Sequence, residues 1–341
     1  MSLDAVGIAL VLGVMVGCAL VPFAVLLHRL AAPAPAGAAA LWLAGLAASA
    51  AAPVIVLVAA LTRVRPSSQG GWGPLAAVFL VLACAVAAIG IGRLGIALGR
   101  VRALKLAATR VDSPFALARG AALRVSQDAP TPLAIGFRRP SVIIPAEFAR
   151  KVDDMELAMI VGHENAHLAR FDDWIKLCEQ VACRALWFDP AVWFFARRLD
   201  EAREMACDDL AVRTRGDARA YAACLLRLFR STDDGLAPAA WGPRPQIARR
   251  IEHLVVAPTA PTRGRSVLFA TALIGAVTVA VSIAVAPPLR DAGPMRLARA
   301  RPAASPAAKP FGGDRPARAF WHDDMLRPGN PLSAPYVRAR I

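Results

Sequence analysis

The sequence predicts a mainly helical membrane protein, in which four membrane-spanning helices accompany one α+β domain that contains a small β-sheet. Three observations support this fold class. Of the 341 residues, 57% are hydrophobic, and the mean hydropathy is +0.47. The apolar residues gather in four long runs. A stretch of ordinary polarity separates the third run from the fourth, and it is long enough to form a domain.

The four apolar runs are each about 20 residues or longer, which is the length that crosses the hydrocarbon layer of a membrane. We expect membrane helices over about 5–27, 38–61, 75–98 and 266–286. Residues 1–99 therefore hold three of them. None of the runs has a polar face, so buried helices of a soluble core are the weaker interpretation. Arg93 indicates that the third span ends early, because an arginine in a span extends toward the interface.

Residues 100–265, between the third and fourth spans, have the polarity of an ordinary folded domain. Three short β-favouring segments, interrupted by Pro and Gly, predict a small sheet. They are 123–127, 132–137 and 141–144. The rest of the domain is expected to be helical. Asp153 and Glu156 form a capping-box pattern for a helix that ends near Ala169. The pair Asp189-Pro190 predicts the start of a helix that ends near Arg213.

The last segment, residues 287–341, is rich in Ala, Pro and Arg and is predicted to be a flexible tail. Basic residues after the third span and before the fourth place the middle domain in the cytoplasm and the N-terminus outside. Arg63, Arg65 and the arginines of the tail oppose this orientation. The first apolar run lacks the basic start and the cleavage site of a removable signal peptide, so we expect it to remain as an anchor.

The net charge of +15 suits contact with the anionic headgroups of a lipid bilayer. Direct nucleic-acid binding is not expected, because the sequence has no zinc-finger spacing and no basic stripe interleaved with aromatic residues. The six cysteines include no close CxxC pair, and two of them lie in apolar runs. This distribution argues against a disulfide framework and against a cysteine zinc site, and it is typical of a reducing compartment.

Residues 163–167 read HENAH, which is an HExxH motif. Side chains four residues apart lie on one face of a helix, so the imidazoles of His163 and His167 are expected to reach one zinc ion. Glu164 then lies beside the metal as a general base, which takes a proton from the attacking water and passes it to the leaving amine. By itself the motif is a moderate signal, because chance matches on charged helices are common.

A catalytic zinc ion commonly has three protein ligands and one open position, so a third ligand must come from elsewhere in the chain. We predict Glu204, on the helix that begins near Pro190. Asp208 is one turn further on the same face and is expected to orient a metal-binding imidazole. Glu201, one turn earlier, is the rival ligand. The alternative to a metal site is a solvated helix face, on which these carboxylates pair with neighbouring arginines.

Several other features have two interpretations. The Tyr221 hydroxyl either donates a hydrogen bond to the oxyanion of the reaction or has a structural role. The segment 132–137 is either an edge strand that pairs with a substrate or part of the sheet core. The aromatic residues of the stretch 187–195 either press against the membrane interface or pack inside the protein. Cys207 is expected to be a small buried residue and not a ligand.

Several stretches between Thr131 and Leu254 resemble the BlaR/MecR-type membrane zinc metallopeptidases. They are TPLAIGFRRPSVIIP, HENAHLARFDDW, WFDPAVWFFARR, the ExxCD pattern from Glu204 to Asp208, Tyr221 with the pair Leu225-Leu226, and RIEHL from Arg250. The order of three spans, a polar domain and a fourth span is also similar to that family.

The resemblance implies a gluzincin-like peptidase domain in a multi-pass protein of the bacterial cytoplasmic (inner) membrane, with Zn²⁺ on His163, His167 and Glu204. It also implies signal transduction in an antibiotic response. Such proteins act as antirepressors, and their cytoplasmic substrate is typically a winged-helix repressor. Antibiotic-sensing members carry a large extracellular penicillin-binding domain after the fourth span. Residues 287–341 contain no SxxK motif, so the resemblance supports the peptidase and not a covalent β-lactam sensor.

Two other functions remain open. One is a membrane quality-control peptidase of the HtpX type, which also places HExxH and a downstream glutamate among membrane spans. The other is a non-proteolytic signal transducer with a structural zinc site. Glu164 argues against the second, because a structural site needs no base.

Overall fold

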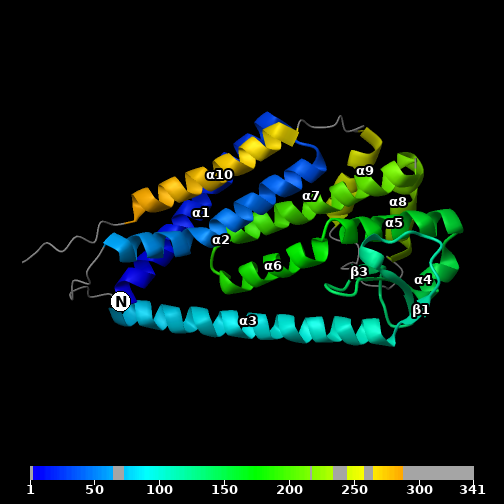
Figure 1. The fold of residues 1–341 in the computed structure, drawn as a ribbon, viewed down its shortest axis with the longest axis horizontal. Helices are drawn as coiled ribbons and strands as arrows, with labels where there is room; N and C mark the ends of the chain where they lie inside the picture. Colours follow the sequence, from blue (N-terminus) through cyan, green and yellow to red (C-terminus); the bar gives the residue numbers. More distant parts are fainter. Residues whose placement is uncertain (1–2, 64–72, 216, 233–243, 257–263, 287–341) are drawn as a thin grey trace, which may run out of the picture. The chain divides into compact units, whose positions relative to one another are not determined.

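The computed structural model describes residues 3–63, 73–215, 217–232, 244–256 and 264–286. The chain divides into two units, residues 1–291 and 292–341, and all of the described residues belong to the first unit. The described part is mainly helical with a small four-stranded mixed sheet, which confirms the predicted fold class (Figure 1). The tail predicted for residues 287–341 lies outside the described residues.

Among the described residues, four helices are long and apolar enough to cross a membrane. They are α1 (Leu3–Ala31), α2 (Pro35–Arg63), α3 (Gly73–Ala107) and α10 (Gly264–Val285). Each of them covers one of the predicted spans, apart from residue 286. The helix α3 continues beyond Arg93 to Ala107, and no proline interrupts it. This pattern is that of a multi-pass membrane protein.

The small sheet follows α3 directly. Its strands are β1 (Thr109–Val111), β2 (Ala122–Ser126), β3 (Leu133–Ile135) and β4 (Ser141–Pro145). The strand order is β1-β2-β4-β3, with β2 and β4 parallel and the two outer pairs antiparallel. Every residue of β4 is buried, as expected of a central strand, whereas β3 lies at an edge. The sequence predicts β2, β3 and β4 but not β1, whose three residues are too few to show a strand pattern.

Helices build the rest of the domain. After a short 3-10 turn, η1 (Ala118–Gly120), they are α4 (Ala146–Lys151), α5 (Asp154–Ala169), α6 (Asp172–Ala185), α7 (Pro190–Arg215), α8 (Ala218–Thr232) and α9 (Arg244–Val256). The predicted capping box of α5 is confirmed. The Glu156 N–H donates to Asp153 Oδ1 at 2.8 Å, and the Asp153 N–H donates to Glu156 Oε2 at 3.3 Å. Helix α7 begins at Pro190, as predicted.

The two halves of α7 lie in different parts of the fold. Its first half packs among α1 and α2, and its second half packs on α5 (Figure 1). The ring of Phe195 is fully buried against Gly45 of α2 and lies 6.3 Å from the Trp42 ring, centroid to centroid. Within the aromatic stretch 187–195, Phe195 is therefore a packing residue, whereas Trp193 is 50% exposed.

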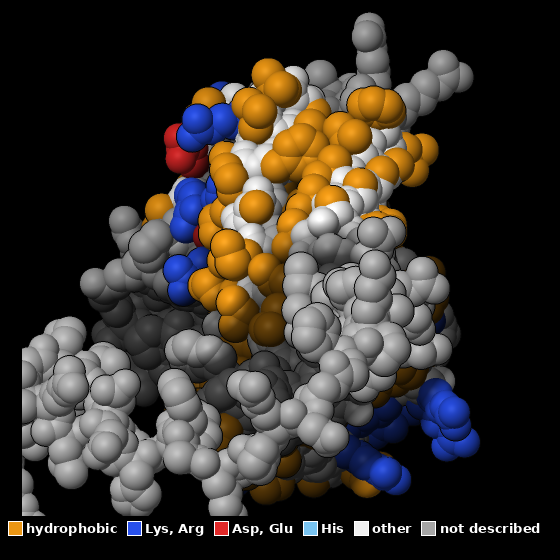
Figure 2. Space-filling model, turned by 90° about the vertical axis from the view of Figure 1, so that its left-hand side faces the viewer, with side chains coloured by type: hydrophobic (Ala, Val, Ile, Leu, Met, Phe, Trp, Pro, Cys, Tyr) orange, Lys and Arg blue, Asp and Glu red, His pale blue; other side chains and the backbone are white. Residues whose placement is uncertain are grey.

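The outer faces of the long helices are strongly apolar. Figure 2 shows a broad area of hydrophobic side chains on one face of the molecule, with Lys and Arg side chains at its margins. Val81 of α3 and Leu268 of α10 are each 71% exposed. An exposed apolar surface of this extent is typical of a face that contacts lipid.

Candidate metal centre

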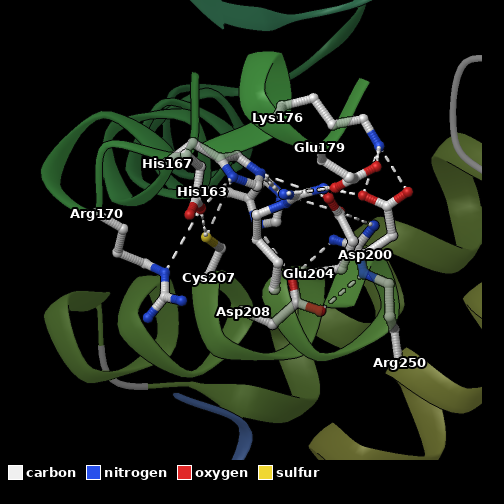
Figure 3. Close-up of polar contacts among 12 residues, drawn as sticks. His163, His167, Arg170, Lys176, Glu179, Asp200, Glu204, Cys207, Asp208 and Arg250 are labelled. Carbon is white, nitrogen blue, oxygen red and sulfur yellow. Dashed lines mark hydrogen bonds and ion pairs between the residues drawn. The ribbon is translucent and has the colours of Figure 1, made fainter. Parts of the chain in front are cut away.

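Two histidines of α5 and one glutamate of α7 bring their metal-binding atoms together. The Nε2 atoms of His163 and His167 lie 3.2 Å apart. Glu204 Oε2 lies 3.6 Å from His163 Nε2, and Glu204 Oε1 lies 3.7 Å from His167 Nε2 (Figure 3). The spacing of four residues places both imidazoles on one face of α5, and the packing of α7 on α5 supplies the carboxylate.

These three donors fit a zinc ion. Zinc binds imidazole nitrogen and carboxylate oxygen at about 2.0–2.2 Å, so two ligands of a tetrahedral site lie about 3.4 Å apart. The observed separations, from 3.2 to 3.7 Å, lie on either side of this value. Glu204 keeps 25% of its side chain exposed, so one side of the cluster is open, as a catalytic zinc site requires.

Buried carboxylates hold both imidazoles from behind. Asp208 Oδ1 lies 3.0 Å from His163 Nδ1, and Asp172 Oδ2 lies 2.9 Å from His167 Nδ1. Both aspartates are buried. A carboxylate on the outer ring nitrogen fixes the tautomer and the orientation of a metal-binding histidine. The arrangement therefore favours the two Nε2 atoms as the metal-facing ones.

Arg250 of α9 neutralises these carboxylates. Its Nε and Nη2 atoms donate to the two oxygens of Asp208, both at 2.7 Å, and its Nη1 atom lies 3.1 Å from Glu204 Oε2. A two-pronged contact is the strong geometry between arginine and a carboxylate. Since Arg250 and Asp208 are both buried, each charge depends on the other for its stability.

The cluster favours positive charge at His163. Burial disfavours the imidazolium form of His163, but hydrogen bonds with Asp208 and Glu204 outweigh burial and raise the pKa of His163 to about 10. Loss of solvent also disfavours a charged Glu204. Nevertheless, the neighbouring His163, His167 and Arg250 hold the pKa of Glu204 well below its usual value. Carboxylates that stay ionised around two imidazoles make a site that suits a divalent cation.

The cluster opens into a cavity of about 550 Å³. Its wall contains His163, Glu164, His167 and Glu204, together with the residues of the edge strand β3. The remainder of the wall comes from α3, α6, α7 and α9, and from Thr131, Pro132 and Phe137 on either side of β3. A cavity of this size holds a ligand as large as a short peptide segment.

The predicted base and the rival ligand lie in different surroundings. Glu164 lies on the cavity wall beside the metal-binding atoms. Glu201 instead forms ion pairs with Arg198 and Arg249, at 3.1 and 3.0 Å. Among the described residues, the carboxylate that joins His163 and His167 in a possible metal-binding group is that of Glu204 and not that of Glu201.

Tyr221 and Cys207 lie behind the cluster. The Tyr221 hydroxyl donates to Asp208 Oδ1 at 2.9 Å and lies 3.1 Å from His163 Nδ1, and the residue is not part of the cavity wall. These contacts favour the structural interpretation of this hydroxyl. Cys207 is buried, and its thiol donates to Asp172 Oδ2 at 3.4 Å. Burial raises the pKa of Cys207, which favours the protonated thiol over a metal-binding thiolate.

Two residues of the network, Asp172 and Arg250, were not predicted as site residues. Asp172 follows His167 by only five residues, but its approach depends on the turn between α5 and α6. Phe171 has a φ of 58°, and this left-handed residue lets the chain reverse so that Asp172 returns to His167. For Arg250, the signal in the sequence is that it begins the RIEHL stretch, which is part of the family resemblance. Its contact with Asp208 could not be predicted, because the two residues are far apart in the sequence.

The Arg250→Ala variant is expected to lose about 3–5 kcal/mol of folding stability, because it leaves the charge of Asp208 buried without a partner. The Arg249→Ala variant is the matched control. Arg249 is the neighbouring arginine, its side chain is 44% exposed, and its ion pair with Glu201 contributes about 0–1 kcal/mol. Thermal unfolding of the two detergent-solubilised variants measures the difference. Equal midpoints would contradict the role of Arg250 as the partner of Asp208.

The comparison with known families agrees with this geometry. A family model described as BlaR1 peptidase M56 matches residues 72–254, which contain the sheet, the HExxH helix, Glu204 and Arg250. A search of curated proteins gives no match. Because the matched residues make up more than half of the chain, the protein belongs to the BlaR1 peptidase M56 family.

Proposed function

We propose that the protein is an integral-membrane zinc endopeptidase of the BlaR/MecR type, which hydrolyses a peptide bond of a cytoplasmic regulatory protein in signal transduction. The observation that carries the proposal is the convergence of three metal-binding atoms beside Glu164 on the wall of one cavity. Family membership supports the metallopeptidase class. The resemblance favours a transcriptional repressor of the winged-helix type as the substrate.

In this proposal, His163, His167 and Glu204 hold the zinc ion. A bound zinc ion lowers the pKa of water and polarises the carbonyl group of the scissile bond. Glu164 takes the proton of the attacking water and gives it to the amine that leaves. The buried carboxylates behind the imidazoles keep both rings in one orientation. Tyr221 acts as a positioning residue in this proposal, because its hydroxyl is engaged by Asp208.

The position of β3 supports a role in holding an extended substrate. It pairs with β4, and Leu133, Ala134 and Ile135 also lie on the cavity wall. A peptide that adds to this edge of the sheet forms main-chain hydrogen bonds beside the metal-binding cluster. We therefore propose that the segment 132–137 acts as a substrate-binding edge strand.

The proposed location is the bacterial cytoplasmic membrane, with the peptidase domain in the cytoplasm. In this arrangement, residues 1–99 and 266–286 supply the four membrane helices, and residues 100–265 supply the peptidase. Basic residues near the end of α3 support the orientation, because cytoplasmic ends of spans carry an excess of Lys and Arg. They are Arg100, Arg102 and Lys105.

Removal of the metal tests the proposal. The full chain in detergent, after treatment with a zinc chelator, is expected to lose cleavage of a mixed-sequence peptide pool. It is expected to regain cleavage with about one equivalent of zinc per chain, because the cluster has one set of three ligands. Cleavage that persists after the zinc content has fallen to background would contradict the proposal. Bound zinc without any cleavage is the result that a structural zinc site would give.

A further inference from the structure

We infer that α6 and the first half of α7 form a hairpin that is inserted into the apolar layer of the membrane. This insertion hairpin, residues 172–199, sets the metal-binding cluster at the depth of the lipid headgroups. The cavity then receives a chain segment that lies at the membrane surface. The insertion is independent of the reaction, whereas the statement about the substrate rests on the proposed peptidase function.

The tip of the insertion hairpin lies at the middle of two long apolar helices. Gly17 of α1 packs against Asp189 at the tip and against Ser49 of α2. If Gly17 carried a Cβ atom, that atom would lie 3.4 Å from both Asp189 Oδ2 and Ser49 Cβ. Gly17 is the middle residue of α1, and Ser49 is the middle residue of α2. At about 1.5 Å per residue, each lies about 21 Å from its helix ends, near the middle of an apolar layer about 30 Å thick. Helix α7 therefore begins at mid-membrane depth.

A third apolar helix also borders the hairpin. The stem of Arg184, at the end of α6, packs on Gly90 of α3, three residues before Arg93. The ring of Phe188 reaches deeper and lies 5.5 Å from the ring of Phe79, centroid to centroid. Phe79 lies about 21 Å along α3 from Arg93, the first charged residue of that helix. The tip is thus inside the apolar layer even if the layer ends at Arg93.

The chemistry of the tip suits an apolar environment. Residues 185–196 contain a single charged side chain, that of Asp189. Asp189 Oδ1 accepts the Ala191 N–H at 2.8 Å, which satisfies a backbone donor at a helix start where water is absent. Arg184 turns back along α6, and its Nη1 atom donates to the Gln180 carbonyl oxygen at 2.9 Å. An arginine at this depth is expected to extend toward the interface in this way.

The metal-binding cluster lies at the height of the headgroups. Glu204 follows Ala191 by 13 residues of α7, which is about 20 Å. Since half of the apolar layer is about 15 Å, Glu204 lies about 5 Å beyond its edge. Trp174 precedes Arg184 by ten residues of α6, which places it about 15 Å from Arg184 toward the metal-binding cluster. It is 42% exposed and stacks edge-on with Phe137 of the cavity wall, as expected of an aromatic residue at the interface.

The cavity extends from the cluster toward the apolar layer. Its wall includes Leu94 of α3 and Gln180 of α6. Leu94 follows Gly90 by four residues, and Gln180 precedes Arg184 by four residues. Both helices therefore place this end of the cavity about 6 Å from the level of Gly90 and Arg184, at the edge of the apolar layer that Arg93 marks. A scissile bond that reaches the cluster therefore lies at the membrane surface, because the cavity ends at the edge of the apolar layer.

Fluorescence quenching by lipids tests the depth of the insertion hairpin. In the full chain, the exposed cysteines are replaced by serine; they are Cys18, Cys84 and Cys178. A fluorescent maleimide is then attached at Trp193→Cys, in the hairpin, or at Met155→Cys, at the start of α5. Both positions are exposed, at 50% and 64%. In phosphatidylcholine vesicles, the label at 193 is expected to be quenched more by lipids with the quencher at the chain end than by lipids with it at the headgroup.

The label at position 155 is expected to show weak quenching by both lipids. Val181 of α6 is 39% exposed and gives a second position in the hairpin. The label is attached at Val181→Cys if the Trp193→Cys protein does not fold. Quenching at both hairpin positions that equals the quenching at position 155 would overturn the insertion. This readout needs no enzyme activity.

Lipid-anchored peptides test the statement about the substrate. A mixed-sequence quenched-fluorescent peptide pool is attached to a palmitoyl chain, either directly or through a Gly-Ser spacer of 20 residues, which spans about 25 Å. Both pools have the same concentration on the vesicle surface. We expect the direct pool to be cleaved at a rate within about threefold of the spaced pool, because the site lies about 5 Å beyond the apolar edge.

Cleavage of the spaced pool alone would overturn the headgroup depth and leave the peptidase function intact. Cleavage of neither pool would contradict the proposed function, and the quenching measurement would then decide the insertion by itself.

Discussion

The Glu164→Gln protein is expected to bind zinc as well as the wild type and to cleave about 10²–10⁴-fold more slowly. Glutamine keeps the size and the polarity of the side chain but cannot take up a proton at neutral pH. Glu164 lies on the cavity wall and is not one of the three residues whose metal-binding atoms converge. The metal content of the purified protein and its rate on the mixed-sequence peptide pool are measured together.

In cells, the same pair of proteins identifies the substrate. New N-termini that appear with the wild type and not with Glu164→Gln mark the cleaved bonds, and they also separate a regulatory substrate from quality control. If the Glu164→Gln protein generated the same new N-termini, the assignment of the base to Glu164 would be wrong. A loss of zinc from this variant would show that Glu164 belongs to the metal cluster instead.

The Glu204→Ala protein is expected to lose more than about 100-fold in zinc affinity. Loss of a residue that only hydrogen-bonds to a metal ligand lowers the metal affinity by about 10–100-fold, and this substitution removes a ligand itself. Glu204 carries the carboxylate that lies 3.6 and 3.7 Å from the two Nε2 atoms, and within the described part of the chain no other carboxylate joins this cluster. Zinc titration against a competing chelator measures the affinity.

Glu201→Ala is the matched control for this experiment. It removes the same group from the same helix, one turn earlier, where the carboxylate pairs with Arg198 and Arg249. We expect this control to keep its zinc affinity and its cleavage rate. Equal zinc affinities for the two variants would place the third ligand elsewhere in the chain.

Local patterns predicted most of the fold. The capping box of α5 involves residues three positions apart, and each apolar run is defined by its own composition. The strand β1 was not predicted, because its three residues become a strand only by pairing with β2. The place of the aromatic stretch 187–195 was also undetermined. It depends on the fit of Phe195 against Gly45, a contact between residues far apart in the sequence.

The same distinction applies to the candidate site. His163 and His167 are related by the period of one helix, so the sequence alone predicts that they meet. Glu204 is predicted as the third ligand because a catalytic zinc ion requires one and because this residue lies on a second helix. Asp172 and Arg250 were missed, because the first depends on a left-handed turn and the second on the docking of α9 against α7. No periodicity in the sequence encodes either approach.

The division of α7 between two parts of the fold has a mechanical consequence. The helix carries Phe195 in the core of the long apolar helices and Glu204 in the metal-binding cluster, with no proline after its first residue. Because the helix is continuous, a shift of its buried first half is expected to displace Glu204 as well. A displacement of about 1 Å exceeds the tolerance of a zinc–ligand distance. Rearrangement of the apolar helices would therefore be enough to assemble or dismantle the cluster.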